Sequence, residues 1–310
     1  MRRFEYTDDV SSGDWIGPRM RGWGTVTGMV PGGFEAYARI FHPVPRDRLE
    51  SSSDPDTVAG RIAAAAAASL PAKVSWRYFC ELNGRQWHPL MQFMSIASDD
   101  VQAPYGSLGV AGWAELARAI AADDASADPA GNDIPVTVGF WTGSGSIAAP
   151  GETPTSVSVL MSRPDDAQLE PRQEAAQRAE ADYANSSEGM SAHGHITSWP
   201  VDVRSGPLLE LPGREYALFT GGLDVFLDPE WPRASGWAFS WDETVNLAWP
   251  SDHSWFVASE VDLDSTIIGG TRPLIERVLA SGLEAAEVPS DADLGWHGDT
   301  LNGSTRPESP

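Results

Sequence analysis

The chain has 310 residues, 41% of them hydrophobic, and this indicates a globular protein with one large or two smaller domains. The formal net charge of −23 disfavours binding of DNA or RNA, because a negative surface repels phosphate, so we expect no nucleic-acid partner. The single lysine, Lys73, has no glycine near it, which excludes a Walker A loop and the lysine of a protein kinase.

Two alternating stretches near the N-terminus favour strands. Trp23–Val30 and Phe34–Phe41 are predicted to pair as a hairpin around Pro31, Gly32 and Gly33. In the second strand, the even-numbered residues from Phe34 to Ile40 face one side, and the odd-numbered residues from Glu35 to Phe41 face the other.

The next elements are predicted from caps and periodicity. An alanine-rich helix begins at Asp56 or Thr57 and extends through Ser69. Val74–Leu82 alternates again and favours a strand, with a helix as the alternative. Residues 108–122 carry one apolar stripe and predict a helix.

The middle and C-terminal parts contain further predicted strands and one helix. Residues 164–192 have no apolar stripe and form either an exposed helix or a mobile segment. Thr271 is expected to cap a helix over Arg272–Ser281. The predicted strands are Val136–Trp141, Ser156–Met161, Leu208–Leu211, Tyr216–Thr220, Trp237–Trp241 and Trp255–Leu263.

Strands grouped with a few helices predict an α+β fold, mostly antiparallel sheet with a few packed helices. We expect an N-terminal α+β half over 1–144, a polar linker or insertion over 145–204, and a Trp-rich α+β half over 205–288. The acidic segment 289–310, rich in Pro and Gly, is predicted to be a disordered tail.

The single cysteine and the N-terminal residues indicate the compartment. Cys80 has no partner for an internal disulfide, which is typical of a reducing cytoplasm. Residues 1–15 contain two Arg but no apolar core of a signal peptide, and no window approaches the length of a membrane span. We therefore expect a cytoplasmic protein with no membrane partner.

An acidic row is the strongest candidate for a site. Glu260, Asp262 and Asp264 alternate with apolar residues, so on a strand they would share one face about 7 Å apart. Such a row suits a divalent cation or an acid/base pair. The alternative is a solvated strand face, charged to prevent edge pairing.

Histidines and tryptophans supply the other candidates. His193 and His195 form a His-X-His pair, a weak candidate for zinc, and His253 lies near the acidic row. Trp249 precedes a proline and is expected to be the most exposed of a Trp set. The set is either a partner-binding patch or the core of a sheet, and its members are Trp231, Trp237, Trp241, Trp249 and Trp255.

Four segments carry a family resemblance: VPGGFEAYARIFHPV (30–44), GRQWHPLMQF (84–93), ELPGREYALFTGGLD (210–224) and NLAWPSDHSWFVASEVDLDSTIIGG (246–270). In this order they resemble a set of actinobacterial proteins of unknown function, over roughly residues 13–290. The resemblance implies a cytoplasmic protein from a high-GC source. It implies no activity, cofactor or active site.

Two functions follow as hypotheses. The first is a non-enzymatic, immunity- or regulatory-type protein that captures a basic protein, without a cofactor, through an acidic surface with Trp anchors. Its expected contact residues are Trp249, Asp252, Trp255, Glu260, Asp262 and Asp264. The second is a divalent-metal-dependent hydrolase that uses the same acidic row with His253.

Overall fold

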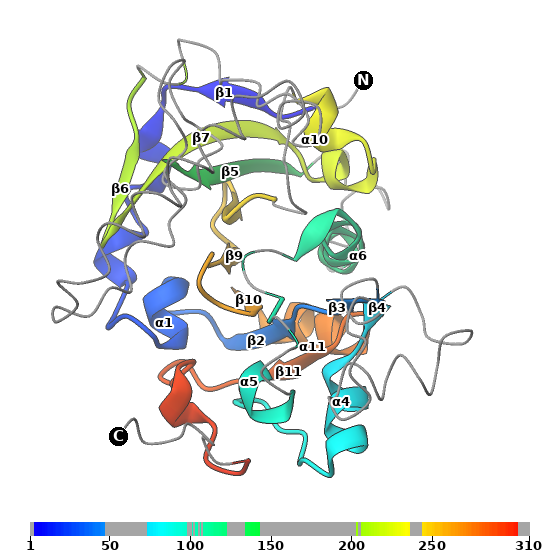
Figure 1. Ribbon diagram of the computed structural model, residues 1–310. Coiled ribbons are helices and arrows are strands. Elements are labelled where there is room, and N and C mark those ends of the chain that lie inside the picture. Colours follow the sequence, from blue (N-terminus) through cyan, green and yellow to red (C-terminus); the bar gives the residue numbers. More distant parts are fainter. Residues whose placement is uncertain are drawn as a thin grey trace, which may run out of the picture.

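Strands from both ends of the sequence form one antiparallel sheet (Figure 1). The structure is a computed structural model that describes residues 3–46, 73–97, 101, 103–104, 106, 108–122, 134–142, 203, 206–235 and 244–302. The strands are β1 (Glu5–Thr7), β2 (Ala36–Phe41), β3 (Val44–Pro45), β4 (Lys73–Val74), β5 (Pro135–Trp141), β6 (Leu209–Leu211), β7 (Arg214–Gly222), β8 (Leu247–Pro250), β9 (Phe256–Ser259), β10 (Ser265–Gly270) and β11 (Ala285–Glu287).

The large sheet has the order β1-β7-β5-β8-β9-β10-β2-β11, with β6 also paired to β7 and every described pairing antiparallel. The short strands β3 and β4 pair separately. The helices are α1 (Val26–Met29), α4 (Trp76–Asn83), α5 (Phe93–Ile96), α6 (Gly109–Ala121), α10 (Trp231–Ala234) and α11 (Arg272–Ala280). The described residues also form the 3-10 turns η1 (Val10–Gly13), η2 (Gly17–Arg19), η5 (Leu223–Leu227) and η6 (Trp296–Gly298). The predicted α+β fold with a mostly antiparallel sheet is confirmed.

Strands of the two predicted halves alternate in one sheet. β5 pairs with β7 and β8, and β2 lies between β10 and β11. The predicted linker 145–204 lies outside the described residues except for Val203, which is buried.

The expected disordered tail is ordered as far as residue 302. Leu294 is buried, and its backbone N–H donates to Gly24 O at 2.8 Å. The backbone carbonyl of Ala292 accepts a hydrogen bond from Val26 N at 3.1 Å. Apolar residues within an acidic segment thus hold it against α1, while 303–310 lie outside the described residues.

Both faces of the sheet are covered, and alternation decides which residues face which layer. On β7, Ala217 and Phe219 belong to the core beneath α6, η5 and α11, whereas Tyr216 and Leu218 belong to the core beneath α1. The alternation predicted for Phe34–Phe41 is confirmed within β2, because Ala38 and Tyr37 lie in opposite cores. It is wrong at Phe34, which precedes β2 and packs in the same core as Tyr37. The predicted helices at 108–122 and 272–281 are confirmed as α6 and α11, and Thr271 caps the second of them.

Two predicted strands are helical instead. Residues 26–29 form α1 because the Thr25 side chain accepts a hydrogen bond from Gly28 N at 3.2 Å and starts a helical turn. Residues 76–83 form α4, the helix that was the alternative, with Ser75 as its N-cap. The Glu284 carboxylate also accepts from the backbone N–H groups of Trp76 and Arg77, which satisfies donors that a helix start leaves free.

A buried polar chain crosses β2, β9 and β10 at His42. His42 Nδ1 lies 2.9 Å from Pro104 O, and Nε2 lies 2.8 Å from Thr266 Oγ1, which is 2.6 Å from Ser259 Oγ. Because the carbonyl only accepts, Nδ1 carries the proton of the neutral ring and Nε2 accepts from Thr266. Burial lowers the pKa of His42 to about 4, so the neutral ring is the form that folds.

We expect acid to destabilise the protein through His42. The folded-state pKa of about 4 lies below the ordinary 6.5, so the unfolded chain takes up the proton first. Stability is therefore full above about pH 6.5 and falls by about 3 kcal/mol as the pH drops to about 4. Denaturant titrations at stepped pH measure this fall. In His42→Phe most of the fall between pH 6.5 and 4 should disappear, and an unchanged fall would assign it to other groups.

Candidate functional site

The turn between β6 and β7 places Arg214 beside the turn that follows β9. Leu211 pairs with Arg214, so Pro212 and Gly213 form a two-residue connection, and Gly213 has a φ of +79°. A positive φ at the residue after proline fits a tight turn and favours glycine. The side chain of Arg214, at the first residue of β7, meets Glu260 and Asp262.

Arg214 is held by two carboxylates. Its Nη2 lies 2.5 Å from Glu260 Oε1 and its Nε lies 3.3 Å from Oε2, which makes a bidentate pair. Nη2 also donates to Asp262 Oδ2 at 3.1 Å. Burial alone would lower the pKa of Arg214, but the two carboxylates outweigh this effect and raise the pKa. Arg214 therefore stays positively charged.

Two tryptophan rings flank the same guanidinium. The guanidinium carbon of Arg214 lies 4.1 Å from the ring centroid of Trp141 and 5.5 Å from that of Trp23, within the range of cation–π contacts. Trp23 is 62% exposed, and the Asp262 side chain is 69% exposed. We call these five residues, Trp23, Trp141, Arg214, Glu260 and Asp262, the Arg214 cleft.

An open hollow of about 530 Å³ adjoins the cleft and is lined by Trp141, Arg214, Glu210 and Glu215. Glu210 and Glu215 are exposed and lie directly opposite each other on β6 and β7. Like charges at opposed positions of a sheet destabilise it. The hollow thus carries a repulsive pair whose cost a bound cation would offset.

Trp249 and Trp255 lie in the core, and the expectation that Trp249 is the most exposed of the Trp set is wrong. Trp249 is 0% exposed and stacks on Phe256, with ring centroids 5.6 Å apart. Trp255 is 4% exposed and lies in the core of the opposite face of the sheet. The two rings therefore cannot form one contact surface. Asp252 is exposed, and its contact role stays a prediction.

The acidic row does not share a face, because a turn at 261–262 interrupts the predicted strand Trp255–Leu263. Glu260 and Asp262 both bind Arg214. Asp264 is buried instead, and its Oδ1 lies 2.9 Å from Arg39 Nη2. The structure brings two of the three carboxylates together.

The histidines do not join the acidic row. His253 stacks on Trp15, with ring centroids 4.3 Å apart. In the parts of the chain that are described, no group of three or more His, Cys, Asp or Glu is placed to hold a metal ion. His193 and His195 lie outside these parts, as do Trp237, Trp241 and the predicted elements 57–69, 156–161, 164–192 and 237–241.

Cys80 and His88 do not form a nucleophile and base. Burial raises the pKa of the Cys80 thiol to about 11, and its Sγ lies 3.7 Å from Met91 Sδ. His88 Nε2 lies 2.7 Å from Asp299 Oδ1. Burial alone would raise the pKa of Asp299, but hydrogen bonds from the backbone of Asn302 and Gln92 and from His88 lower it. These groups anchor the C-terminal segment.

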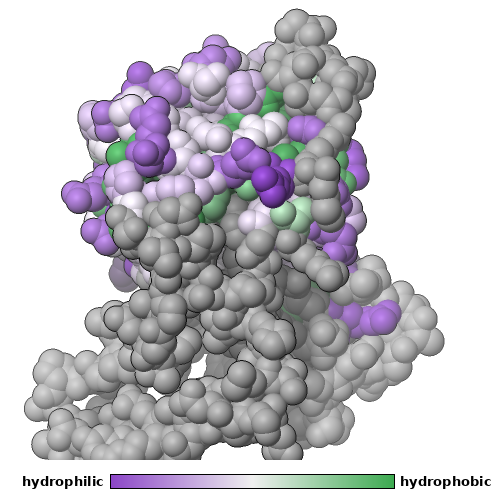
Figure 2. Space-filling model, turned by 90° about the horizontal axis from the view of Figure 1, so that it is seen from above, coloured by the Kyte–Doolittle hydropathy of each residue, from purple (hydrophilic) through white to green (hydrophobic). Residues whose placement is uncertain are grey.

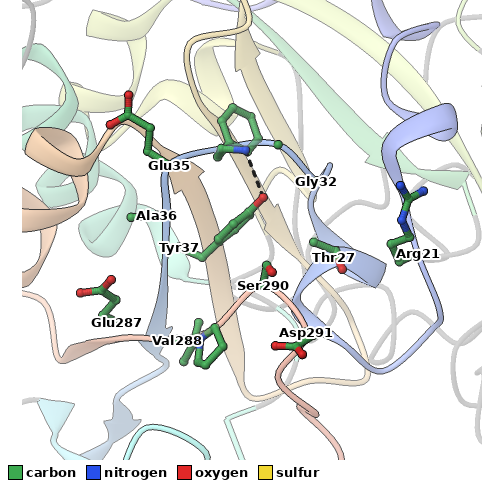
Figure 3. A pocket seen from close by; sticks show the side chains of 13 residues that line it. Arg21, Thr27, Gly32, Glu35, Ala36, Tyr37, Glu287, Val288, Ser290 and Asp291 are labelled. Carbon is green, nitrogen blue, oxygen red and sulfur yellow. Dashed lines mark hydrogen bonds between the residues drawn. The ribbon is translucent and has the colours of Figure 1, made fainter.

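A second hollow, of about 500 Å³, lies beside Tyr37 (Figure 3). Its acidic groups include Glu35 and Glu287, both exposed. Glu35 accepts from Arg272 N at 3.0 Å, and Glu287 pairs with Arg272 Nη1 at 3.1 Å. The Tyr37 hydroxyl accepts from Phe34 N and donates to Pro31 O. The hydrogen-bonding groups of Glu35, Tyr37 and Glu287 in this hollow thus already have partners within the chain.

Where Figure 2 colours the surface by hydropathy, purple and pale residues prevail and green hydrophobic residues form small separate areas. Among the described residues, the large hydrophobic side chains that are mostly exposed are Trp23 and Leu301. No described helix has the length and apolar character that crossing a membrane requires. These findings single out Trp23 as the exposed aromatic group of the described surface.

Comparison with known proteins gives no match to a family model, to a curated protein or to a solved structure. The resemblance to actinobacterial proteins therefore stays a prediction.

Sequence reasoning missed Trp23, Trp141 and Arg214. The predicted strand Trp23–Val30 includes Trp23, although the neighbours Gly22 and Gly24 are a turn signal that favours an exposed loop. The Pro-Gly pair before Arg214 likewise indicated a hairpin turn. Nothing in the sequence indicated that these two turns would lie together.

Proposed function

We propose that this protein is a non-enzymatic binding protein that captures a basic protein partner through the Arg214 cleft. The observation that carries the proposal is that Trp23 and Asp262, both mostly exposed, contact the same guanidinium group of Arg214. An aromatic ring and a carboxylate on one small surface are the groups that bind a cationic side chain.

The charge balance of the cleft supports a cationic partner. Glu260 already neutralises Arg214, so Asp262 and the exposed pair Glu210 and Glu215 leave the surface negative. The formal net charge of −23 adds a long-range field that speeds the approach of a basic protein. Trp23 then serves as the central anchor, since tryptophan is enriched among residues that dominate binding energy. A cytoplasmic location stays part of the proposal.

The test is capture from a lysate of the source organism, with variants that separate the cleft from overall charge. Wild-type protein is expected to retain a basic protein at low salt and release it at high salt. Trp23→Ala should weaken the affinity for the isolated partner by about thirtyfold, the effect of an interface hot spot, and Asp262→Asn by about tenfold.

Glu276→Gln is the matched control for Asp262→Asn. Both variants remove one exposed negative charge, but Glu276 lies on α11, which packs on the face of the sheet opposite Tyr216. The control should bind like the wild type. Equal loss in Glu276→Gln and Asp262→Asn would mean that net charge, not the cleft, attracts the partner. No retained partner at low salt would refute the proposal.

A further inference from the structure

A small cavity lies behind Trp23 in the Arg214 cleft. Its lining includes the apolar side chains of Met29, Leu211 and Leu247, together with the polar residues Arg214, Tyr216, Ser259 and Glu260. The cavity measures about 20 Å³, which is room for one group the size of a water molecule. A cavity of this size with polar residues in its wall is suited to a small polar head rather than to a ring.

Tyr216 supplies an unused hydroxyl to this cavity. The residue is 6% exposed, and its hydroxyl makes no hydrogen bond to any residue that the structure describes. Because the hydroxyl has no partner among the described residues, a water molecule or a ligand must complete its hydrogen bonding. Burial and the nearby Glu260 raise the pKa of Tyr216, so the hydroxyl stays protonated and keeps acceptor capacity.

The Glu260 carboxylate also has acceptor positions that no described hydrogen bond uses. Its Oε1 accepts from Arg214 Nη2 and from Val261 N, whereas Oε2 accepts only the long 3.3 Å contact from Arg214 Nε. A carboxylate offers about four acceptor positions. The cavity therefore presents two acceptors, one of them charged, to a group that donates hydrogen bonds.

The loop that carries Trp23 is fixed at its base and open at its tip. At the base, Thr25 Oγ1 donates to Gly22 O at 2.7 Å, and Gly28 lies so close that an added Cβ would be 2.3 Å from that oxygen. At the tip, a Cβ added to Gly22 or Gly24 would meet no atom within 4 Å, and Gly24 has a φ of +82°. The backbone on both sides of Trp23 is thus held by hydrogen bonds at Gly22 O and Gly24 O, while space remains open beside the two glycines.

We propose that a lysine side chain of the basic partner enters beneath Trp23 and places its ammonium group between the Tyr216 hydroxyl and the Glu260 carboxylate. This inference rests on the proposed function and names the side chain that the cleft takes. An ammonium is compact and carries three donors, so it matches a water-sized space with two acceptors. Arg214 also lines the cavity, but Glu260 and Asp262 together outweigh its charge and leave one negative charge for the ammonium. A guanidinium is planar and wider, and Arg214 already occupies the position between the two tryptophans. The methylene stem of the lysine would lie along the Trp23 ring.

The experiment uses two synthetic peptides of equal length and charge, one alternating glycine with lysine and the other glycine with arginine. Calorimetric titration of the full chain should give about tenfold tighter binding of the lysine peptide, since a hydrogen bond to a charged group contributes that much. Tyr216→Phe removes only the hydroxyl and should abolish the preference while leaving weak, salt-sensitive binding of both peptides. Trp23→Ala, in an exposed loop, should weaken the lysine peptide more than the arginine peptide.

Each other outcome is decisive. Equal binding of the two peptides that still depends on Trp23 and Asp262 would overturn the lysine site and leave the proposed function standing. A lysine preference that survives in Tyr216→Phe would also overturn it, because the cavity would then hold a water only. If neither peptide binds, the lysine site is refuted, and capture from the lysate decides separately whether the proposed function fails as well.

Discussion

Replacing Asp264 with alanine is expected to lower the free energy of unfolding by about 3–5 kcal/mol, because it leaves a buried cation without its partner. Arg39 is 0% exposed, and its guanidinium donates to Ser265 Oγ at 2.8 Å and to the carbonyls of Pro89 and Met91. The rings of Phe41 and Trp76 also lie against it, so Asp264 is the charged group among these contacts. Burial lowers the pKa of Arg39, and the adjacent Asp264 opposes that effect. Denaturant unfolding measures the loss.

Asp262→Ala is the matched control for this prediction. Its side chain is 69% exposed and also pairs with an arginine, but a pair of this kind contributes less than about 1 kcal/mol. A double variant, Arg39→Met with Asp264→Ala, should recover part of the lost stability, because no charge is then left unpaired. Similar small losses at 262 and 264 would contradict the structure and restore the predicted solvated strand face.

Trp249→Ala is expected to cost about 3–5 kcal/mol of stability, the usual result of emptying a core site filled by a large ring. The Trp249 side chain is fully buried and stacks on Phe256 at an interplanar angle of 18°. Thermal and denaturant unfolding should both show the loss. The variant should keep its affinity for the partner at temperatures where it is folded.

Trp23→Ala should show the opposite pattern. Because Trp23 is 62% exposed, its removal should change stability by no more than about 0.5 kcal/mol while weakening partner capture. If Trp249→Ala instead remains stable and loses binding, Trp249 is a surface contact as the sequence suggested. The two variants together thus distinguish a tryptophan that stabilises the core from one that contacts the partner.

Periodicity and capping predicted the elements that depend on neighbours in the sequence. The apolar stripe of α6, the alternation of β2 and the Thr271 cap of α11 all follow from residues a few positions apart. Alternation failed at 74–82, because aromatic residues suit either a strand or a helix there. The Glu284 carboxylate, more than 200 positions away, accepts hydrogen bonds from the first backbone N–H groups of α4 and so helps to stabilise the start of this helix.

The sequence by itself determined the fold class, the two faces of the strands and the strongly negative charge, because composition and periodicity are local properties. Only the tertiary structure decided which acidic residues are buried and which face a partner. Asp264 pairs with Arg39, 225 positions away, and Asp262 pairs with Arg214, 48 positions away. Two carboxylates that look equivalent in the sequence therefore have different surroundings, because the chain brings a buried arginine to one and a partly exposed arginine to the other.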